Sequence, residues 1–266
     1  KIAAVPFHYW TPDAYQGSPT PITGYLSVGP TVGAFVLLIK LFVIALAPLA
    51  ALWIPVMVVL AAATMTLGNL VALTQSNVKR MLAYSSIAHT GYLMVGIVAA
   101  GAGEAAGIAG VLFYAAAYAF MNLGAFAFLT ALQGRPGATT QLSDLAGLGR
   151  KHPRMAILAT IFLLSLTGIP PPAGFFAKTY VILAAVQAGG PATIRAVIAV
   201  LNAAIAAFYY LRVIVYLFMR DPAEPAVQVA EGPMLRAGLL IAAIGTVALG
   251  LAPTPIIEAV IQALAT

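Results

Sequence analysis

Residues 155–194 read MAILATIFLLSLTGIPPPAGFFAKTYVILAAVQAGGPATI, an apolar stretch in which Lys178 is the only charged side chain. The part up to Thr167 has the composition of an apolar helix. The segment GIPPPAG at 168–174 then interrupts it, because proline lacks an amide donor and glycine loosens helical backbone. The helix resumes at Phe175. Membrane proteins use such breaks to place irregular backbone and a charge at depth, around a path for ions or substrate.

The composition of the whole chain indicates a polytopic membrane protein. Hydrophobic residues make up 62% of the 266 residues and charged residues only 8%, against about a quarter in soluble domains. The chain has no cysteine and three scattered histidines, so we expect no metal and no cofactor bound within it. The net charge of +6 is more typical of cytoplasmic loops than of nucleic-acid binding, so the lipid bilayer is the expected surrounding and nucleic acid is not an expected partner.

A membrane core is crossed by about 20 apolar helical residues, and this length divides the chain into spans. The expected fold is an all-α transmembrane bundle with seven spans, at 19–46, 52–74, 79–100, 105–132, 154–187, 192–219 and 235–264, of which 154–187 is discontinuous. Residues 1–8 are expected to be the end of a truncated helix, and 8–18 a loop. The start has no Met and no leader pattern, so we expect it to lie inside a longer protein.

The distribution of basic residues predicts the orientation. If the turns alternate sides, one side collects Lys79, Arg80, Arg135, Arg150, Lys151, Arg154, Arg220 and Arg236, and the other has only Lys40 and Arg195, plus Glu104. The first side is expected to be cytoplasmic, which puts the C-terminus in the periplasm. Within the connector 133–153, residues 142–149 are expected to form a short amphipathic helix at the interface.

Two lysines are expected within the membrane region, Lys178 and, if its helix is truncated, Lys1. A charge at this depth costs about 2.5–3.5 kcal/mol on insertion scales, so it usually faces protein or water. Burial disfavours the charged form, which makes such a lysine able to change charge during a working cycle. The alternatives are that Lys178 extends to the interface or makes one static hydrogen bond, and that Lys1 is only a cut helix end.

Polar side chains form stripes at helical spacing on two further spans. The first stripe is Ser85, His89 and Tyr92, and the second is Tyr114, Tyr118 and Asn122. Such residues often serve only packing or interhelical hydrogen bonding. His89 favours function, because an imidazole can both accept and donate a proton near neutral pH. Weaker candidates of the same kind are Thr31, Thr66, Asn69 and Asn202.

Several motifs resemble a known family. They are KIAAVPFHYWTPD at 1–13, PTPIT at 19–23, NVKRMLAYSSIAH at 77–89, MNLGAF at 121–126, LSDLAGL at 142–148 and LSLTGIPP at 164–171. These resemble the antiporter-like membrane subunits of the proton-pumping NADH–quinone oxidoreductase, respiratory complex I. Within that family, the segments at 10–15 and 85–92 are more similar to the subunit N branch, the counterpart of mitochondrial subunit 2, than to L or M.

The resemblance implies a fold of two inverted repeats, each with a broken helix that carries a lysine. Lys1 matches the lysine of the first broken helix and Lys178 that of the second. His89 matches a histidine on the polar axis of the membrane arm. From their positions on the polar stripes, Ser85, Tyr92, Tyr118 and Asn122 are expected as supporting residues, together with Thr31. Thr31 stands where relatives often carry lysine. The expected divisions are 1–46, the end of the first repeat; 47–219, the second repeat; and 220–266, a cytoplasmic loop and C-terminal helix.

The function implied by the resemblance is proton translocation from cytoplasm to periplasm in a bacterial inner membrane, coupled electrostatically to quinone reduction elsewhere. The chain would then belong to an NADH:quinone oxidoreductase as a translocase subunit. NADH, FMN, iron–sulfur clusters and quinone are expected in partner subunits, and the neighbours are expected to be subunit M and small membrane subunits. The alternatives are a structural membrane subunit without its own proton path, and a subunit of a cation/proton antiporter.

Overall fold

The computed structural model describes residues 1–132, 141–189, 192–222, 229–230 and 232–265. In this part of the chain all regular structure is helical and no strand is present. The α-helices are α1 (Trp10–Gly17), α2 (Thr20–Leu38), α3 (Ala50–Thr74), α4 (Val78–Gly101), α5 (Ala106–Ala131), α6 (Leu148–Lys151), α7 (Pro153–Thr167), α8 (Ala173–Gln187), α9 (Ala192–Met219), α10 (Pro233–Leu251) and α11 (Pro253–Ala265). A π-helical segment, η1 (Ile39–Ala45), continues α2, and short 3-10 turns form η2 (Ala47–Leu49) and η3 (Leu142–Leu145).

The helices that are long and apolar enough to cross a membrane confirm the expected polytopic fold. Six such spans occur among the described residues, made by α2 with η1, by η2 with α3, and by α4, α5, α9 and α10. The two shorter apolar helices α7 and α8 follow one another across the Gly/Pro segment. Together they form the expected discontinuous span.

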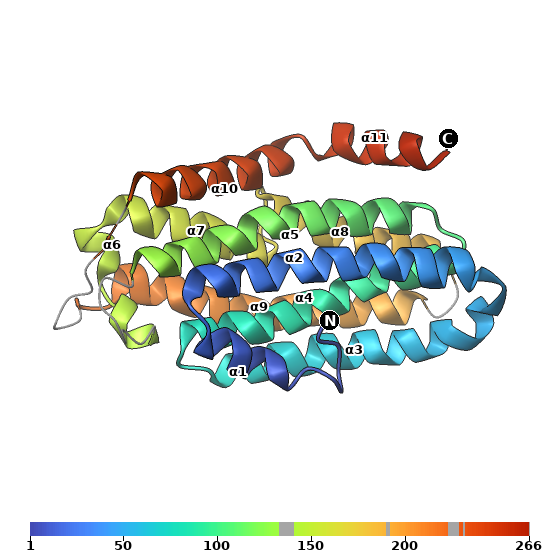
Figure 1. Cartoon of the computed structure of the whole chain (residues 1–266), viewed down its shortest axis with the longest axis horizontal. Coiled ribbons are helices and arrows are strands. Elements are labelled where there is room, and N and C mark those ends of the chain that lie inside the picture. Colours follow the sequence, from blue (N-terminus) through green and yellow to red (C-terminus); the bar gives the residue numbers. More distant parts are fainter. Residues whose placement is uncertain (133–140, 190–191, 223–228, 231, 266) are drawn as a thin grey trace.

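The helices lie side by side in one bundle, with α4 at its centre (Figure 1). In the most apolar 18-residue stretch of α4, 94% of the residues are buried, against 17% in the corresponding stretch of the span made by α2 and η1. Helix α4 packs against α3, α5 and α8, whereas α10 and α11 lie along one edge (Figure 1). Polar side chains on α4 are therefore enclosed by protein.

The N-terminal segment differs from the expectation. Residues 1–9 form no helix, and the segment expected to be a loop contains α1. Helix α1 packs against α4. A side chain of α4 donates hydrogen bonds to carbonyls at the C-terminal end of α1. The Lys79 ammonium donates to Ser18 O at 2.6 Å and to Gln16 O at 3.3 Å, and Arg80 pairs with Asp13 at 2.6 Å. A long-range partner for the helix end, invisible in local sequence, stabilises this short helix.

The last span, expected as one helix over 235–264, is broken into α10 and α11. Ala252 leaves the helical region with φ −132° and ψ 63°, and Pro253 opens the second helix. Proline disfavours helical backbone in the residue before it and removes an amide donor, which explains the interruption.

The connector before α7 also differs from the expectation. In place of an amphipathic helix over 142–149, the chain forms η3 and the single turn α6, separated by Gly147 at φ 68°. Gly147 N donates to Tyr216 O at 3.0 Å, and Leu142 N donates to Ser76 O at 2.8 Å. The connector thus joins the α3–α4 turn and the end of α9 at one end of the bundle. Arg135, expected on the same side, lies outside the described residues.

Candidate functional site

The break between α7 and α8 is built by local backbone hydrogen bonding. Gly168 has φ +89°, a left-handed conformation that glycine adopts at little cost, and it ends α7. Its N–H donates to Leu164 O at 3.1 Å and Ser165 O at 2.9 Å, and Ile169 N also donates to Leu164 O at 3.1 Å. These hydrogen bonds satisfy two carbonyls in the last turn of α7, but the carbonyls of the final residues of the helix are left without helical partners.

Lys178 supplies those carbonyls with a donor. Its side chain is 5% exposed, and its Nζ donates to Leu166 O at 2.9 Å and to Thr167 O at 2.7 Å. The C-terminal end of a helix carries partial negative charge, so an ammonium group is stabilised there. Lys178 is therefore directed into the break, where it makes two hydrogen bonds to the end of α7.

Close backbone contacts hold the break in place. A Cβ added to Gly174, at the start of α8, would lie 1.8 Å from Ser165 O, and Gly174 N donates to Ser165 Oγ at 3.0 Å. Helix α10 covers the other side, since a Cβ on Gly250 would lie 2.2 Å from Pro171 O. The two half-helices and α10 thus meet without space between their backbones.

Lys178 faces α4. Its Nζ lies 5.0 Å from the ring centroid of Tyr92, within the range of a cation–π contact. The Tyr92 hydroxyl donates to Ala199 O of α9 at 3.1 Å. Tyr92 therefore connects the lysine in the break with α4 and α9.

His89 is the centre of a buried hydrogen-bond network. The side chain is 2% exposed, its Nδ1 lies 2.6 Å from the Tyr114 hydroxyl, and its Nε2 lies 3.3 Å from the Tyr210 hydroxyl. The Tyr210 hydroxyl also forms a short hydrogen bond with Ser85 Oγ. Each of these groups can donate or accept, depending on the tautomer of the ring, so a proton can be passed along the network in either direction.

The polar residues continue from α5 to α2. The Tyr118 hydroxyl donates to Ser86 Oγ at 2.7 Å, and its ring lies 5.0 Å from that of His89, centroid to centroid. Asn122 Nδ2 donates to Ser27 Oγ on α2 at 2.7 Å. The two expected stripes thus face each other and extend across four helices, α9, α4, α5 and α2; we call this set of buried polar residues the polar axis.

The remaining expected residues lie at the end of this polar axis or outside it. Thr31 is buried on α2, one turn after Ser27. Lys1 is exposed, so the structure does not bring its ammonium group into the axis. The next residue, Ile2, is close to it, since its carbonyl accepts from Thr90 Oγ1 at 2.8 Å, beside His89.

A second polar cluster was only partly expected. The Tyr209 hydroxyl donates to Asn69 Oδ1 at 3.0 Å, Asn69 Nδ2 donates to Asn202 Oδ1 at 3.1 Å, and Asn202 Nδ2 donates to Thr66 Oγ1 at 3.2 Å. Sequence reasoning missed Tyr209 and Tyr210 of α9. Tyr210 carries no periodic polar signal along its own helix, and its role is visible only from its partners on α4.

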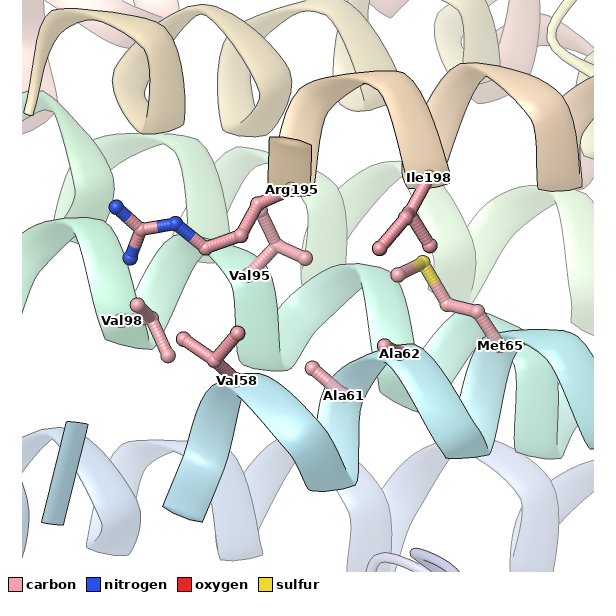
Figure 2. Close-up of a pocket in the computed structure, with 8 residues that line it drawn as sticks. All are labelled: Val58, Ala61, Ala62, Met65, Val95, Val98, Arg195 and Ile198. Atoms are coloured by element: carbon pink, nitrogen blue, oxygen red, sulfur yellow. The ribbon is translucent and has the colours of Figure 1, made fainter. Parts of the chain in front are cut away.

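Arg195 is a buried cation, although the sequence analysis placed it in a turn between two spans. It is 8% exposed, and its Nε has no hydrogen-bond partner among the described residues. Figure 2 shows its guanidinium extending beside Val95 and Val98 of α4. The adjoining cavity, of about 10 Å³, has room for about one water molecule and is lined by Val58, Ala61, Ala62, Met65, Val95, Val98, Arg195 and Ile198.

No group of three or more His, Asp and Glu that could hold a metal ion occurs among the described residues. The polar axis is made of hydroxyl, amide and imidazole groups. These groups can donate and accept hydrogen bonds.

Comparison with known proteins gives a consistent family. The profile of the family described as "NADH:quinone oxidoreductase/Mrp antiporter, TM" matches residues 1–206. "NADH-quinone oxidoreductase subunit N 2" of Roseiflexus castenholzii (strain DSM 13941 / HLO8) is 51% identical over 265 residues, covering 98% of this chain and 52% of that protein. "NADH-quinone oxidoreductase subunit N" of Chloroflexus aggregans (strain MD-66 / DSM 9485) is 47% identical over 265 residues, covering 99% and 53%.

Solved structures share the fold. A chain of respiratory complex I from Thermus thermophilus with bound aureothin has a TM-score of 0.80 and 34% identity, covering 97% of this chain and 55% of that one. A chain of the Mrp complex from Dietzia sp. DQ12-45-1b has a TM-score of 0.85 at 24% identity with the same coverage, which shows a common fold. The chain spans about half the length of the curated relatives it matches. It belongs to the NADH:quinone oxidoreductase/Mrp antiporter transmembrane family.

Proposed function

We propose that the chain is part of subunit N of a proton-translocating NADH–quinone oxidoreductase and contains a proton path centred on Lys178. The names of its relatives support the subunit, and the family supports proton translocation. The observation that carries the site is the Lys178 ammonium, buried in the helix break on two carbonyls of α7 and next to the network of His89.

In this mechanism Lys178 alternates between its charged and neutral forms. The carbonyls of α7 favour the ammonium, whereas burial disfavours it, so a change of charge nearby can tip the balance. Moving one charge through 100 mV requires about 2.3 kcal/mol. A hydrogen bond to a charged group contributes about 1.5–3 kcal/mol, so gaining or losing one such bond at Lys178 is of the right size.

The proton moves between Lys178 and the polar axis through water. No hydrogen bond among the described residues joins Lys178 directly to His89, and Tyr92 lies between them. From His89 the path would continue through Tyr114, Tyr118 and Asn122 toward Thr31, where a hydroxyl and water would replace the lysine that relatives often carry. Lys1 would belong to the preceding half-channel.

Within the complete enzyme this chain would carry charge and no redox centre. NADH, FMN, iron–sulfur clusters and quinone would bind to partner subunits, and subunit M and small membrane subunits would be its neighbours. The end of the bundle that carries Arg150, Lys151 and Arg220 would face the cytoplasm of a bacterial inner membrane, with the C-terminus in the periplasm. In this orientation, the proposed proton transfer runs from the cytoplasm to the periplasm.

The test is Lys178→Ala in the full-length subunit within its native assembly. We expect proton pumping per NADH oxidised to fall while the complex still assembles, because alanine cannot carry the proton. Lys40→Ala is the matched control, since Lys40 is exposed on η1. Full pumping in the Lys178 variant would instead favour the purely structural subunit, and absence of redox subunits from the purified assembly would favour the cation/proton antiporter.

A further inference from the structure

The small cavity beside Arg195 lies between α3, α4 and α9, and none of its lining residues belongs to the polar axis. One of them, Met65, also touches α4 at Gly91, since a Cβ added to that glycine would lie 2.4 Å from Met65 Cγ. Gly91 directly precedes Tyr92, and the lining residue Val95 follows Tyr92 by about one turn. The cavity therefore lies close to Tyr92 along α4.

Tyr92 connects this region with the lysine in the helix break. Its ring lies 5.0 Å from Lys178 Nζ, and its hydroxyl donates to Ala199 O of α9 at 3.1 Å. Ala199 directly follows Ile198, which lines the cavity, and it comes about one turn after Arg195. A water molecule in the cavity would thus stand just beyond the contact between Lys178 and Tyr92, toward the start of α9.

The polar group at this cavity is a buried donor with a fixed charge. Arg195 is 8% exposed, its Nε–H has no hydrogen-bond partner among the described residues, and the other lining residues are all apolar (Figure 2). A guanidinium stays protonated in proteins and only donates hydrogen bonds. A water held by Nε–H would accept that bond with its oxygen, so both the positive charge and the occupied lone pair oppose its protonation.

We propose, on the basis of the proton path through Lys178, that Arg195 is an electrostatic barrier. Water can occupy the cavity but an excess proton cannot, which closes this route between Lys178 and the end of the bundle where α9 begins. Fixed positive charges exclude protons from water-containing pores in the same way. Two unit charges about 4 Å apart near a protein surface repel each other enough to shift an equilibrium roughly a thousandfold. Arg195 would therefore prevent leakage and carry no proton itself.

The experiment measures passive proton leak in liposomes that contain the full-length subunit in its native assembly. A pH difference is imposed without NADH, its decay is followed with a pH-sensitive dye trapped inside, and the leak of protein-free liposomes is subtracted. We expect Arg195→Gln to raise the leak at least tenfold, because the charge is lost while the space for water remains. Arg195→Lys keeps the charge and should leak as little as the unchanged protein. An unchanged leak in Arg195→Gln would overturn the proposal.

Two further variants separate the barrier from surface charge and from a general disturbance of packing. Lys40→Gln removes one charge from an exposed position on η1 and should leave the leak unchanged. Ala62→Val, added to Arg195→Gln, places two more methyl groups at the cavity and should return the leak to its original level. An equal rise in Lys40→Gln, or no recovery on filling, would contradict a barrier here. If Arg195→Gln does not assemble, Arg195→Ser makes the same comparison.

Lys178→Ala in the Arg195→Gln background tests whether the leak passes the lysine. We expect the double variant to leak less than Arg195→Gln alone, and a leak of the same size would contradict the proposed route. A normal leak in Arg195→Gln, together with lost pumping in Lys178→Ala, would overturn the barrier and leave the proposed function in place. Full pumping in Lys178→Ala would overturn the proton path itself, whatever leak is measured.

Discussion

At the scale of single residues, Lys178 combines two tasks. Its ammonium group satisfies the last carbonyls of α7 and is at the same time the titratable group nearest to the break. Loss of its proton would weaken both hydrogen bonds, because a neutral amine is a poorer donor than an ammonium group. The protonation of one residue is thereby connected to the geometry of a helix end.

Gly168→Ala, compared with a control glycine, should distinguish the effect of backbone strain on stability from the effect of the position of Lys178 on proton pumping. A non-glycine residue at φ +89° costs about 1–2 kcal/mol, and the new Cβ would lie 2.9 Å from Lys178 Cδ. We expect lower thermal stability and reduced proton pumping, measured on the purified assembly. Gly189→Ala is the control: Gly189 has φ +70° and nothing within 4 Å of an added Cβ, so it should lose stability only. Equal pumping in both variants would argue against a role for lysine position.

Tyr210→Phe should interrupt the network at His89. The variant removes the hydroxyl that contacts Ser85 and His89, and buried polar groups left without a partner cost about 1–3 kcal/mol. We expect slower proton transfer, read from the pumping rate under a fixed NADH supply. Tyr209→Phe removes an equally buried hydroxyl, which bonds to Asn69, and should cost stability without slowing transfer. A similar rate in both variants would exclude Tyr210 from the path.

The sequence predicts part of this site, for reasons that differ from residue to residue. Ser85 with His89, and Tyr118 with Asn122, could each be placed on one face of a helix, because helical spacing is visible in the sequence. Tyr210 could not, since its partners belong to another helix. The burial of Arg195 depends on how α9 packs on α3 and α4, which local composition does not determine.

At the scale of elements, the contact between α7 and α8 should tolerate no side chain at Gly174. Its added Cβ would meet Ser165 O at 1.8 Å, so Gly174→Ala must separate the two half-helices. Overpacking of this kind costs about 1–3 kcal/mol, which thermal unfolding of the purified assembly would detect. Gly33→Ala, in α2 and with nothing within 4 Å, should be neutral or stabilising. Equal stability of both variants would show that the half-helices are free to move apart.

The membrane-crossing elements were predictable, and their ends were not. Long apolar runs fix the spans, because few other structures accommodate them. Helix α1 was taken for a loop because its stabilisation comes from Lys79 and Arg80, more than sixty residues away. The break at Pro253 had a local signal, the X–Pro pair, which was outweighed by the apolar run around it.

At the scale of the whole molecule, the orientation can be tested by chemical labelling. The chain has no cysteine, so single cysteines introduce unique reactive sites in it. Arg220→Cys, near the end of α9, should react with a membrane-impermeant maleimide in inside-out vesicles, and Glu104→Cys, before α5, in right-side-out vesicles. The opposite pattern would reverse the proposed direction of transport.

The contact between α10 and the Gly/Pro segment also has a consequence for the order of events during biosynthesis. Pro171 and Gly250 touch in the finished protein, yet the ribosome makes them about eighty residues apart. Until α10 has left the translocon, the irregular backbone between α7 and α8 lacks the cover that α10 gives it in the finished protein. The newly made chain would need a temporary cover there, such as an insertase or a chaperone. Truncation before α10 should therefore expose the lysine-containing break to quality-control proteolysis, even though every residue of the polar axis has already been synthesised.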